Sequence, residues 1–260
     1  VGNAKVASSH NAVLYGDEPA MVAKKFPDVP FYIGADRVAV AKHLLQHEQV
    51  NIIFADDVFK NRRLGSNLDI VIVDGTEELK NYQVLPVGRG RECQSGLKRA
   101  DFIIVNKVNL ITPDKKREVL DYISQILAEK IVPVIESEYY VKELKSLDSA
   151  QSEELVSNER VLLFSGLGNP KGFEDLMNQK LNVVCHEIFR DHYQYSRHDL
   201  QKILSLAAKT KVKRIITTEK DAVKISSLVG ADSNIWVAQL APKLSLRVKS
   251  LHEKILSICR

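Results

Sequence analysis

Residues 50–64 read VNIIFADDVFKNRRL, and the apolar run Val50–Ala55 in this stretch stops at two adjacent carboxylates, Asp56 and Asp57. A short apolar run that contains Ile and Phe predicts a strand buried on both faces, as in a parallel α/β sheet. The carboxyl ends of such strands open onto the ligand crevice, where acidic side chains can hold Mg²⁺ against phosphate oxygens. A solvated turn or a helix N-cap is the alternative interpretation of the two carboxylates.

The bulk composition is that of an ordinary globular protein. The 260 residues are enough for one large or two modest domains, and 45% hydrophobic and 27% charged residues are enough to build a full core. The net charge of +4 is too small to indicate nucleic acid as a partner, and no apolar run reaches the roughly 20 residues that span a bilayer. Cys93, Cys185 and Cys259 form neither a metal-ligand spacing nor a disulfide framework, which is typical of a reducing compartment.

Short apolar runs alternate with helical patterns along most of the chain. Strands are predicted at 29–33, 50–55, 69–73, 101–105, 130–135, 160–165, 182–188, 212–217 and 235–238, and helices after Pro19, at 37–47, 114–129, 197–208, 222–228 and at the C-terminus. This alternation predicts an α/β fold with a doubly wound parallel sheet. Residues 136–159 are polar and predict a linker or connecting helix. We therefore expect two domains, 1–145 and 155–260, with a boundary near 136–159.

Three segments of the first half carry polar candidates with more than one local interpretation. Asp17 lies at the start of the helix predicted from Pro19, where it is either a capping carboxylate or an acceptor for the proton of a substrate hydroxyl. His43 and His47 share one side of a predicted helix, but no third metal ligand accompanies them, so solvated histidines are expected. Glycines and arginines alternate at 88–91, which is a pattern suited to a phosphorylated ligand or to simple surface ion pairs.

Two segments of the second half are equally ambiguous. Gly166-Leu167-Gly168 follows a predicted strand and resembles a dinucleotide-binding loop, although Gly172 comes one position late and Pro170 interrupts the pattern. A Rossmann-type nicotinamide oxidoreductase is therefore one alternative function. Asp191-His192 follows another predicted strand and is either a turn or part of a proton relay.

Four motifs, taken together and in order, resemble the tetraacyldisaccharide 4′-kinases of lipid A biosynthesis. The motifs are Gly16-Asp17-Glu18-Pro19; Asp56-Asp57 with Phe59 and Arg62-Arg63-Leu64; Leu85-Pro86-x-Gly88 with Arg91-Glu92 and Leu97-Lys98-Arg99-Ala100-Asp101; and Thr218-Glu219-Lys220-Asp221-Ala222-Val223-Lys224. Gly166-x-Gly-Asn-Pro and Asp191-His192 fall between the last two, as they do in that family. The resemblance covers nearly the whole chain.

The resemblance implies a P-loop-kinase-like fold and a function. Such an enzyme moves the γ-phosphate of ATP, with Mg²⁺, onto the 4′-hydroxyl of a tetraacyldisaccharide 1-phosphate, a glycolipid, at the cytoplasmic face of the bacterial inner membrane. Carried over to this sequence, Asp17 is the general base with His192 as its partner, and Asp56 and Asp57 handle Mg²⁺ and the phosphates. The residues expected to line the substrate or nucleotide cleft are Glu18, Arg91, Glu92, Glu219, Lys220 and Asp221.

The chain also departs from the family pattern. None of its 12 glycines is followed by Lys, so no Walker-A loop is present in these 260 residues, and we expect an N-terminally truncated form that is inactive by itself while the intact enzyme is active. Val58 replaces a glycine of the family's Asp-Asp-Gly-Phe-Gln-His motif, and Lys60 and Asn61 replace its Gln and His. These substitutions favour the alternative of a degenerate homologue that binds glycolipid without catalysis.

Overall fold

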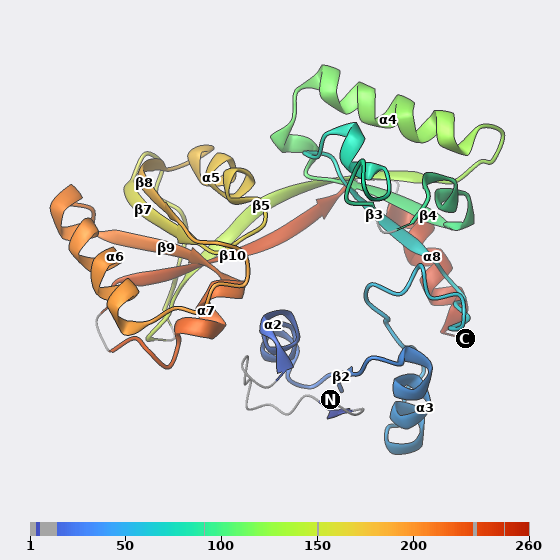
Figure 1. Ribbon diagram of the computed structural model, residues 1–260, viewed down its shortest axis with the longest axis horizontal. Coiled ribbons are helices and arrows are strands. Elements are labelled where there is room, and N and C mark those ends of the chain that lie inside the picture. The colour runs from blue at the N-terminus through green and yellow to red at the C-terminus, as the bar shows by residue number, and fades with distance from the viewer. Residues whose placement is uncertain are drawn as a thin grey trace. The chain divides into compact units, whose positions relative to one another are not determined.

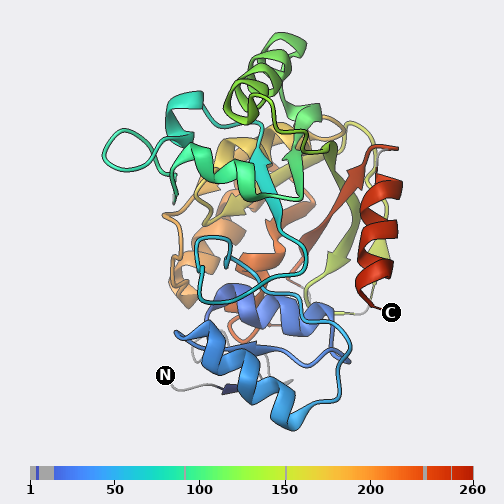
Figure 2. The same ribbon diagram turned by 90° about the vertical axis from the view of Figure 1, so that its right-hand side faces the viewer.

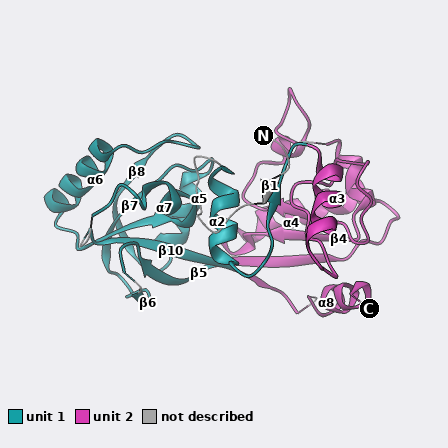
Figure 3. Ribbon diagram, turned by 90° about the horizontal axis from the view of Figure 1, so that it is seen from below, with its two compact units in different colours: residues 1–35, 140–241 teal, residues 36–139, 242–260 magenta. Residues whose placement is uncertain are grey.

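The fold is described by a computed structural model, which covers residues 4–5, 15–90, 92–149, 151–230, 233–246 and 248–259. The chain forms two compact units (Figure 3). Unit 1 consists of residues 1–35 and 140–241, and unit 2 consists of residues 36–139 and 242–260. Two long strands, β5 (Val134–Ser146) and β10 (Ile235–Leu244), contain residues of both units.

Unit 2 is built on parallel strands covered by a helix on each face. β3 (Ile70–Asp74) pairs with β4 (Phe102–Asn106), and β4 pairs with the first residues of β5. Because side chains alternate along a strand, Ile103 and Val105 of β4 pack against α4 (Pro113–Leu127), whereas Phe102 packs with Leu251 of α8 (Val248–Ile258). Figure 2 shows both helices beside the strands.

Unit 2 also contains the helix α3 (Arg37–His47) and several short 3₁₀ turns. α3 matches the predicted helix and begins at Asp36, whose carboxylate accepts hydrogen bonds from two backbone amides, the N-cap arrangement. Three 3₁₀ turns follow later in the chain: η1 (Leu79–Tyr82), η2 (Gln94–Arg99) and η3 (Val108–Leu110).

Unit 1 contains a larger part of the sheet. Its strands follow the order β5-β10-β9-β7-β8, where β7 is Arg160–Ser165, β8 is Asn182–Ile188 and β9 is Arg214–Thr218. The pairs β10–β9, β9–β7 and β7–β8 are all parallel, and a short strand, β6 (Ser152–Glu153), pairs antiparallel with β5. Five consecutive residues of β7, from Val161 to Ser165, are buried, as expected for a central strand with helices on both faces.

The described helices of unit 1 lie either before β5 in sequence or directly after β7, β8 and β9 in turn (Figure 1). They are α2 (Asp17–Lys25), α5 (Pro170–Asn178), α6 (Arg197–Thr210) and α7 (Glu219–Ile225). α6 and α7 share one core with the strands, in which Ile203 and Ile225 pack with Phe164, whereas α5 packs against β8. α2 packs against α7, and β2 (Tyr32–Ile33) pairs antiparallel with β1 (Ala4–Lys5). The predicted α/β fold with a parallel sheet flanked by helices is confirmed.

Three local predictions were wrong. Residues 50–55 form no strand, and Ile53 and Phe54 are exposed, because this run pairs with no neighbouring strand in the described structure. Residues 136–146 are strand rather than linker, since Ile135, Ser137, Val141 and Leu144 are buried along a half-buried strand with polar residues between them. α7 begins at Glu219 rather than at 222, because Thr218 caps the helix: the Thr218 hydroxyl accepts a hydrogen bond from the backbone amide of Asp221.

The compact units also divide the chain differently from the two expected domains. The segment 1–35 belongs with residues 140–241, and the C-terminal helix α8 belongs with residues 36–139. The division between 139 and 140 falls inside the expected boundary region 136–159. The expected ranges 1–145 and 155–260 stay a prediction about how the chain folds into domains.

Candidate active site

Asp17 is a buried carboxylate at the first residue of α2. Gly16 precedes it with φ 94°, a left-handed conformation that glycine adopts without strain, and this turn starts the helix at Asp17. The carboxylate therefore lies at the positive end of the helix dipole, which favours a negative charge. Only 6% of its side chain is exposed, so its charge depends on the partners around it.

His192 lies next to this carboxylate. Its Nδ1 is 3.2 Å from Oδ2 of Asp17, although the two residues are 175 positions apart in sequence. His192 lies in the loop after β8 at φ 57°, a left-handed conformation in which histidine is enriched. Its side chain is 64% exposed, so the pair has one buried member and one that reaches solvent.

Asp191 and Lys220 fix the loop that carries His192. Nζ of Lys220 donates to Oδ1 of Asp191 at 2.9 Å, and the His192 amide donates to the same oxygen at 3.0 Å. The hydrogen bond from Lys220 is the main reason why the pKa of Asp191 lies below its ordinary value. Lys220 also lies 3.9 Å from Glu18, and Glu219 pairs with Lys25 at 3.1 Å.

A second buried carboxylate, Asp221, is linked to Asp17 through Lys224. Its Oδ2 accepts from the amide of Gly166 at 3.0 Å and from the hydroxyl of Thr218 at 2.8 Å, and its Oδ1 is 3.2 Å from Nζ of Lys224. The same Nζ is 3.2 Å from Oδ2 of Asp17. A Cβ atom at Gly166 would lie 3.1 Å from Oδ1 of Asp221, so a larger residue here would require the carboxylate to shift by a few tenths of an ångström.

Burial and the neighbouring Asp221 raise the pKa of Tyr195, which stays a neutral phenol at the edge of this cluster. The loops involved follow β7, β8 and β9, which are adjacent and parallel. They therefore meet at the carboxyl edge of the sheet, where α/β proteins bind ligands.

A further polar line in unit 1 was not predicted. The hydroxyl of Ser165 lies 2.9 Å from Nε2 of His186, and Nδ1 of His186 lies 3.0 Å from Glu174 on α5. Ser165 is fully buried and the His186 side chain is 3% exposed. The sequence gives no motif for this contact, because it depends on the pairing of β7 with β8 and the packing of α5 on β8.

In unit 2, Asp56 and Asp57 form a turn with exposed side chains. Asp57 has φ 54°, so the chain reverses at these residues rather than at the end of a strand. Of the turn's neighbours, Val58 and Phe59 are half-buried, and Phe59 packs on the core between β4 and α4. The turn is therefore attached to unit 2 through its apolar neighbours.

Glu92 is held in unit 2 by Arg99. Two guanidinium nitrogens of Arg99 donate to its two carboxylate oxygens at 2.5 and 2.8 Å, and this bidentate contact holds the pKa of Glu92 below its ordinary value. Arg99 also stacks over the ring of Phe59 at 4.4 Å, and Arg62 reaches Glu92 at 3.4 Å. Arg91 lies outside the described residues.

The described residues contain no group of three or more His, Cys, Asp or Glu side chains that could hold a metal ion. Of the two histidines on α3, His47 makes its contact within the helix, because its Nδ1 lies 2.8 Å from the carbonyl oxygen of His43.

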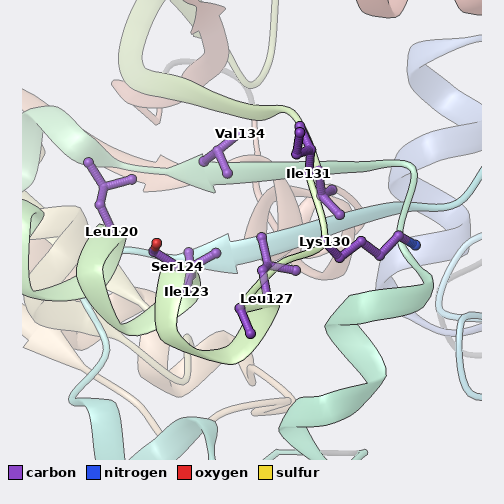
Figure 4. A pocket seen from close by; sticks show the side chains of 9 residues that line it. Leu120, Ile123, Ser124, Leu127, Lys130, Ile131 and Val134 are labelled. Atoms are coloured by element: carbon purple, nitrogen blue, oxygen red, sulfur yellow. The ribbon is translucent and has the colours of Figure 1, made fainter.

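A pocket of about 200 Å³ lies between α4 and the start of β5 (Figure 4) and is lined mainly by apolar side chains such as Leu120, Ile123 and Leu127. It lacks the convergent polar groups that orient a polar ligand.

The predicted site residues thus fall into two groups. Unit 1 brings five of them together around one carboxylate cluster, namely Asp17, Glu18, His192, Lys220 and Asp221, whereas the Glu219 side chain pairs with Lys25 at the other end of α2. Unit 2 contains Asp56, Asp57 and Glu92. Lys224 was quoted in the sequence only as part of a motif, and its place between Asp17 and Asp221 was missed, since the contact needs α2 and α7 packed together.

Comparisons with known proteins point to one family. The family model described as tetraacyldisaccharide-1-P 4′-kinase matches residues 2–260. The tetraacyldisaccharide 4′-kinase of Bdellovibrio bacteriovorus is 32% identical over 252 residues, which cover 96% of this chain and 73% of the relative, and that of Halothermothrix orenii is 35% identical over 222 residues, which cover 81% and 58%.

A crystal structure described as the "apo" form of LpxK from Aquifex aeolicus in complex with ATP has the same fold. It matches with a TM-score of 0.71 and 24% identity over 100% of this chain and 75% of that one. The chain thus spans from about three fifths to three quarters of the length of these relatives. Since the family model matches almost every residue, the chain belongs to the tetraacyldisaccharide-1-P 4′-kinase family.

Proposed function

We propose that this chain carries the proton-accepting site of a kinase that phosphorylates the 4′-hydroxyl of a tetraacyldisaccharide 1-phosphate. The observation that supports this most directly is the 3.2 Å contact between Asp17 and His192. Two residues that the family resemblance pairs as base and partner, far apart in sequence, are neighbours in unit 1. The relatives from Bdellovibrio and Halothermothrix carry the same activity in their names.

In this proposal Asp17 accepts the proton of the attacking hydroxyl. Lys224 and His192 both contact its Oδ2, so among the described residues Oδ1 is the carboxylate oxygen left for a substrate hydroxyl. His192, which reaches solvent, orients the carboxylate and faces the incoming sugar. Phosphoryl transfer depends on positioning and charge neutralisation, and a positioned base adds to both.

ATP is the proposed phosphoryl donor, because the Aquifex relative of the same fold is described in complex with it. Mg²⁺ is bound in such enzymes through one or two carboxylates together with water and substrate phosphates. Asp56 and Asp57 fit this donor set, since they are adjacent, exposed oxygen ligands on one turn. When bound, the metal neutralises phosphate charge. We further propose that Glu18, Arg91, Glu92, Glu219, Lys220 and Asp221 line or support the substrate and nucleotide cleft.

The remaining partners are a glycolipid and a membrane surface. No helix among the described residues combines the length and the apolar character that crossing a bilayer requires. The substrate named for the relatives carries acyl chains, so we propose a peripheral position at the cytoplasmic face of the inner membrane. Nucleic acid is not among the proposed partners.

The test is a phosphorylation assay with the natural full-length protein, Mg·ATP and tetraacyldisaccharide 1-phosphate. We expect the glycolipid to gain one phosphate by mass spectrometry, and we expect no gain when EDTA removes Mg²⁺. Asp57→Asn is expected to raise severalfold the Mg²⁺ concentration that gives half the maximal rate. Asp114→Asn, which alters an exposed carboxylate of the same unit, is the matched control and is expected to leave it unchanged.

The same assay decides the second candidate function, a homologue that binds glycolipid without catalysis. The substitutions at Val58, Lys60 and Asn61 favour this candidate. Saturable binding of the glycolipid with no phosphate gain at any Mg²⁺ concentration would establish it and would overturn the kinase proposal. Family membership gives no support to the nicotinamide oxidoreductase, and the Gly166 amide that a dinucleotide loop would use is already bound to Asp221.

A further inference from the structure

Lys224 is a buried cation in the middle of unit 1. Only 2% of its side chain is exposed, which is rare for lysine unless the charge is paired. It is paired twice, with Asp17 at 6% exposure and with Asp221 at 0%. A charge enclosed to this degree holds its position, because each partner that moves away leaves an uncompensated charge in the protein interior.

The contact joins two helices and a loop. Lys224 and Asp221 lie one turn apart on α7, and Asp17 lies on α2, which packs against α7 (Figure 3). Asp221 is itself fixed, because its other oxygen accepts from the Gly166 amide and the Thr218 hydroxyl. A continuous set of hydrogen bonds and ion pairs therefore runs from the loop after β7 to the Asp17 carboxylate.

We propose that Lys224 is a positioning residue for Asp17, and that Asp221 holds Lys224 in place. This inference rests on the proposed function of Asp17 as the proton acceptor. A carboxylate at the start of a helix can rotate about two side-chain bonds, and productive proton transfer needs one of its oxygens aimed at the hydroxyl. Buried Lys224 and exposed His192 both contact Oδ2, each at 3.2 Å.

The competing explanation is that Lys224 only holds α2 against α7 and does not position the Asp17 carboxylate. Unit 1 offers a matched control for it, because Lys25 of α2 pairs with Glu219 of α7 at 3.1 Å and joins the same two helices. Lys25 lies at the far end of α2 from Asp17. Lys25 is 42% exposed and Lys224 only 2%, so loss of the buried pair is expected to lower the free energy of unfolding more. Loosening of α2 from α7 would raise KM as well as lower kcat, whereas loss of positioning lowers kcat alone.

The experiment compares Lys224→Met and Lys25→Met in the natural full-length protein. We expect Lys224→Met to lower kcat by at least tenfold while KM for ATP and for glycolipid stays within about threefold, because proton transfer and not binding is affected. Lys25→Met is expected to keep kcat within about twofold of wild type. Lys224→Arg retains both ion pairs and is expected to recover most of the lost kcat.

Two further measurements keep the inference testable. If Lys224→Met folds poorly, Asp221→Asn/Lys224→Met removes the unpaired carboxylate along with the cation, and its kcat is expected to stay as low. The ring ¹⁵N signals of His192 are expected to shift in Lys224→Met and not in Lys25→Met, because only the former frees the carboxylate that His192 contacts. A folded variant with wild-type kcat and unchanged His192 signals would overturn the inference. If the wild type is inactive but the His192 signals still shift in Lys224→Met, the proposed function alone is overturned.

Discussion

His186 and His192 both contact a carboxylate within unit 1, but their surroundings differ. His192 is 64% exposed and contacts buried Asp17, whereas His186 is 3% exposed and lies between buried Ser165 and half-exposed Glu174. In the first pair the imidazole reaches solvent. In the second the imidazole and the hydroxyl are both enclosed by β7, β8 and α5.

The order Ser165–His186–Glu174 is that of a nucleophile, a base and an orienting acid. However, no substrate can reach a hydroxyl that is fully buried, and the neighbouring Gly166 amide already donates to Asp221. Hydrogen-bond geometry alone therefore does not identify an active site. Access to one member of the pair, at the carboxyl edge of the sheet, separates the candidate site from a structural hydrogen-bond line.

The largest effect is expected from Asp17→Asn. This change keeps the shape of the side chain but removes the proton acceptor, so kcat is expected to fall by about 10²- to 10⁴-fold with little change in KM for ATP. Steady-state kinetics of the full-length protein measure it. Asp28→Asn, which alters an exposed carboxylate of the same unit, is expected to keep wild-type kcat. Equal kcat in Asp17→Asn and wild type would remove Asp17 from its proposed role.

A smaller effect is expected from His192→Gln. Glutamine retains a polar group near Asp17 but loses the imidazole, so kcat is expected to fall by roughly ten- to hundredfold. The control is His198→Gln, which changes an exposed histidine on α6 and is expected to leave kcat unchanged. If His192→Gln retained full activity, the contrast with His186 would have no functional meaning.

The smallest effect on activity is expected from Ser165→Ala. The change leaves Nε2 of His186 without its buried partner, so the free energy of unfolding is expected to fall by about 1–3 kcal/mol while kcat stays within about twofold of wild type. Urea denaturation measures the stability. Ser205→Ala, at an exposed serine on α6, is expected to change it by less than about 0.5 kcal/mol. A large loss of kcat in folded Ser165→Ala would give the buried line a catalytic role.

Much of the fold could be predicted because local patterns agree with tertiary packing in unit 1. The apolar run 160–165 and the run 182–188 became β7 and β8 with the predicted ends, because parallel strands covered by helices read as nearly continuous apolar runs. The run 50–55 has the same character, but it lacks a paired strand in the described structure. A strand is stabilised by its neighbours, and a single sequence does not specify them.

The candidate site was predictable only in part for the same reason. Asp17 and His192 were found through motifs, and their 3.2 Å contact agrees with the resemblance that paired them. Lys224 gave no separate signal, because a lysine in a helical pattern is usually solvated. Its burial follows from the packing of α2 on α7, and the 207 positions that separate Asp17 from Lys224 hide that packing from the sequence.

The discontinuous chain of unit 1 has one more consequence. Residues 36–139 separate the segment 1–35, which contains α2, from residues 140–241, so the two segments of the unit are joined by contacts that are long-range in sequence. Segments held in this way open locally before the unit as a whole unfolds. We therefore expect heating or denaturant to release α2, which carries the proposed base Asp17, while the sheet of unit 1 is still folded.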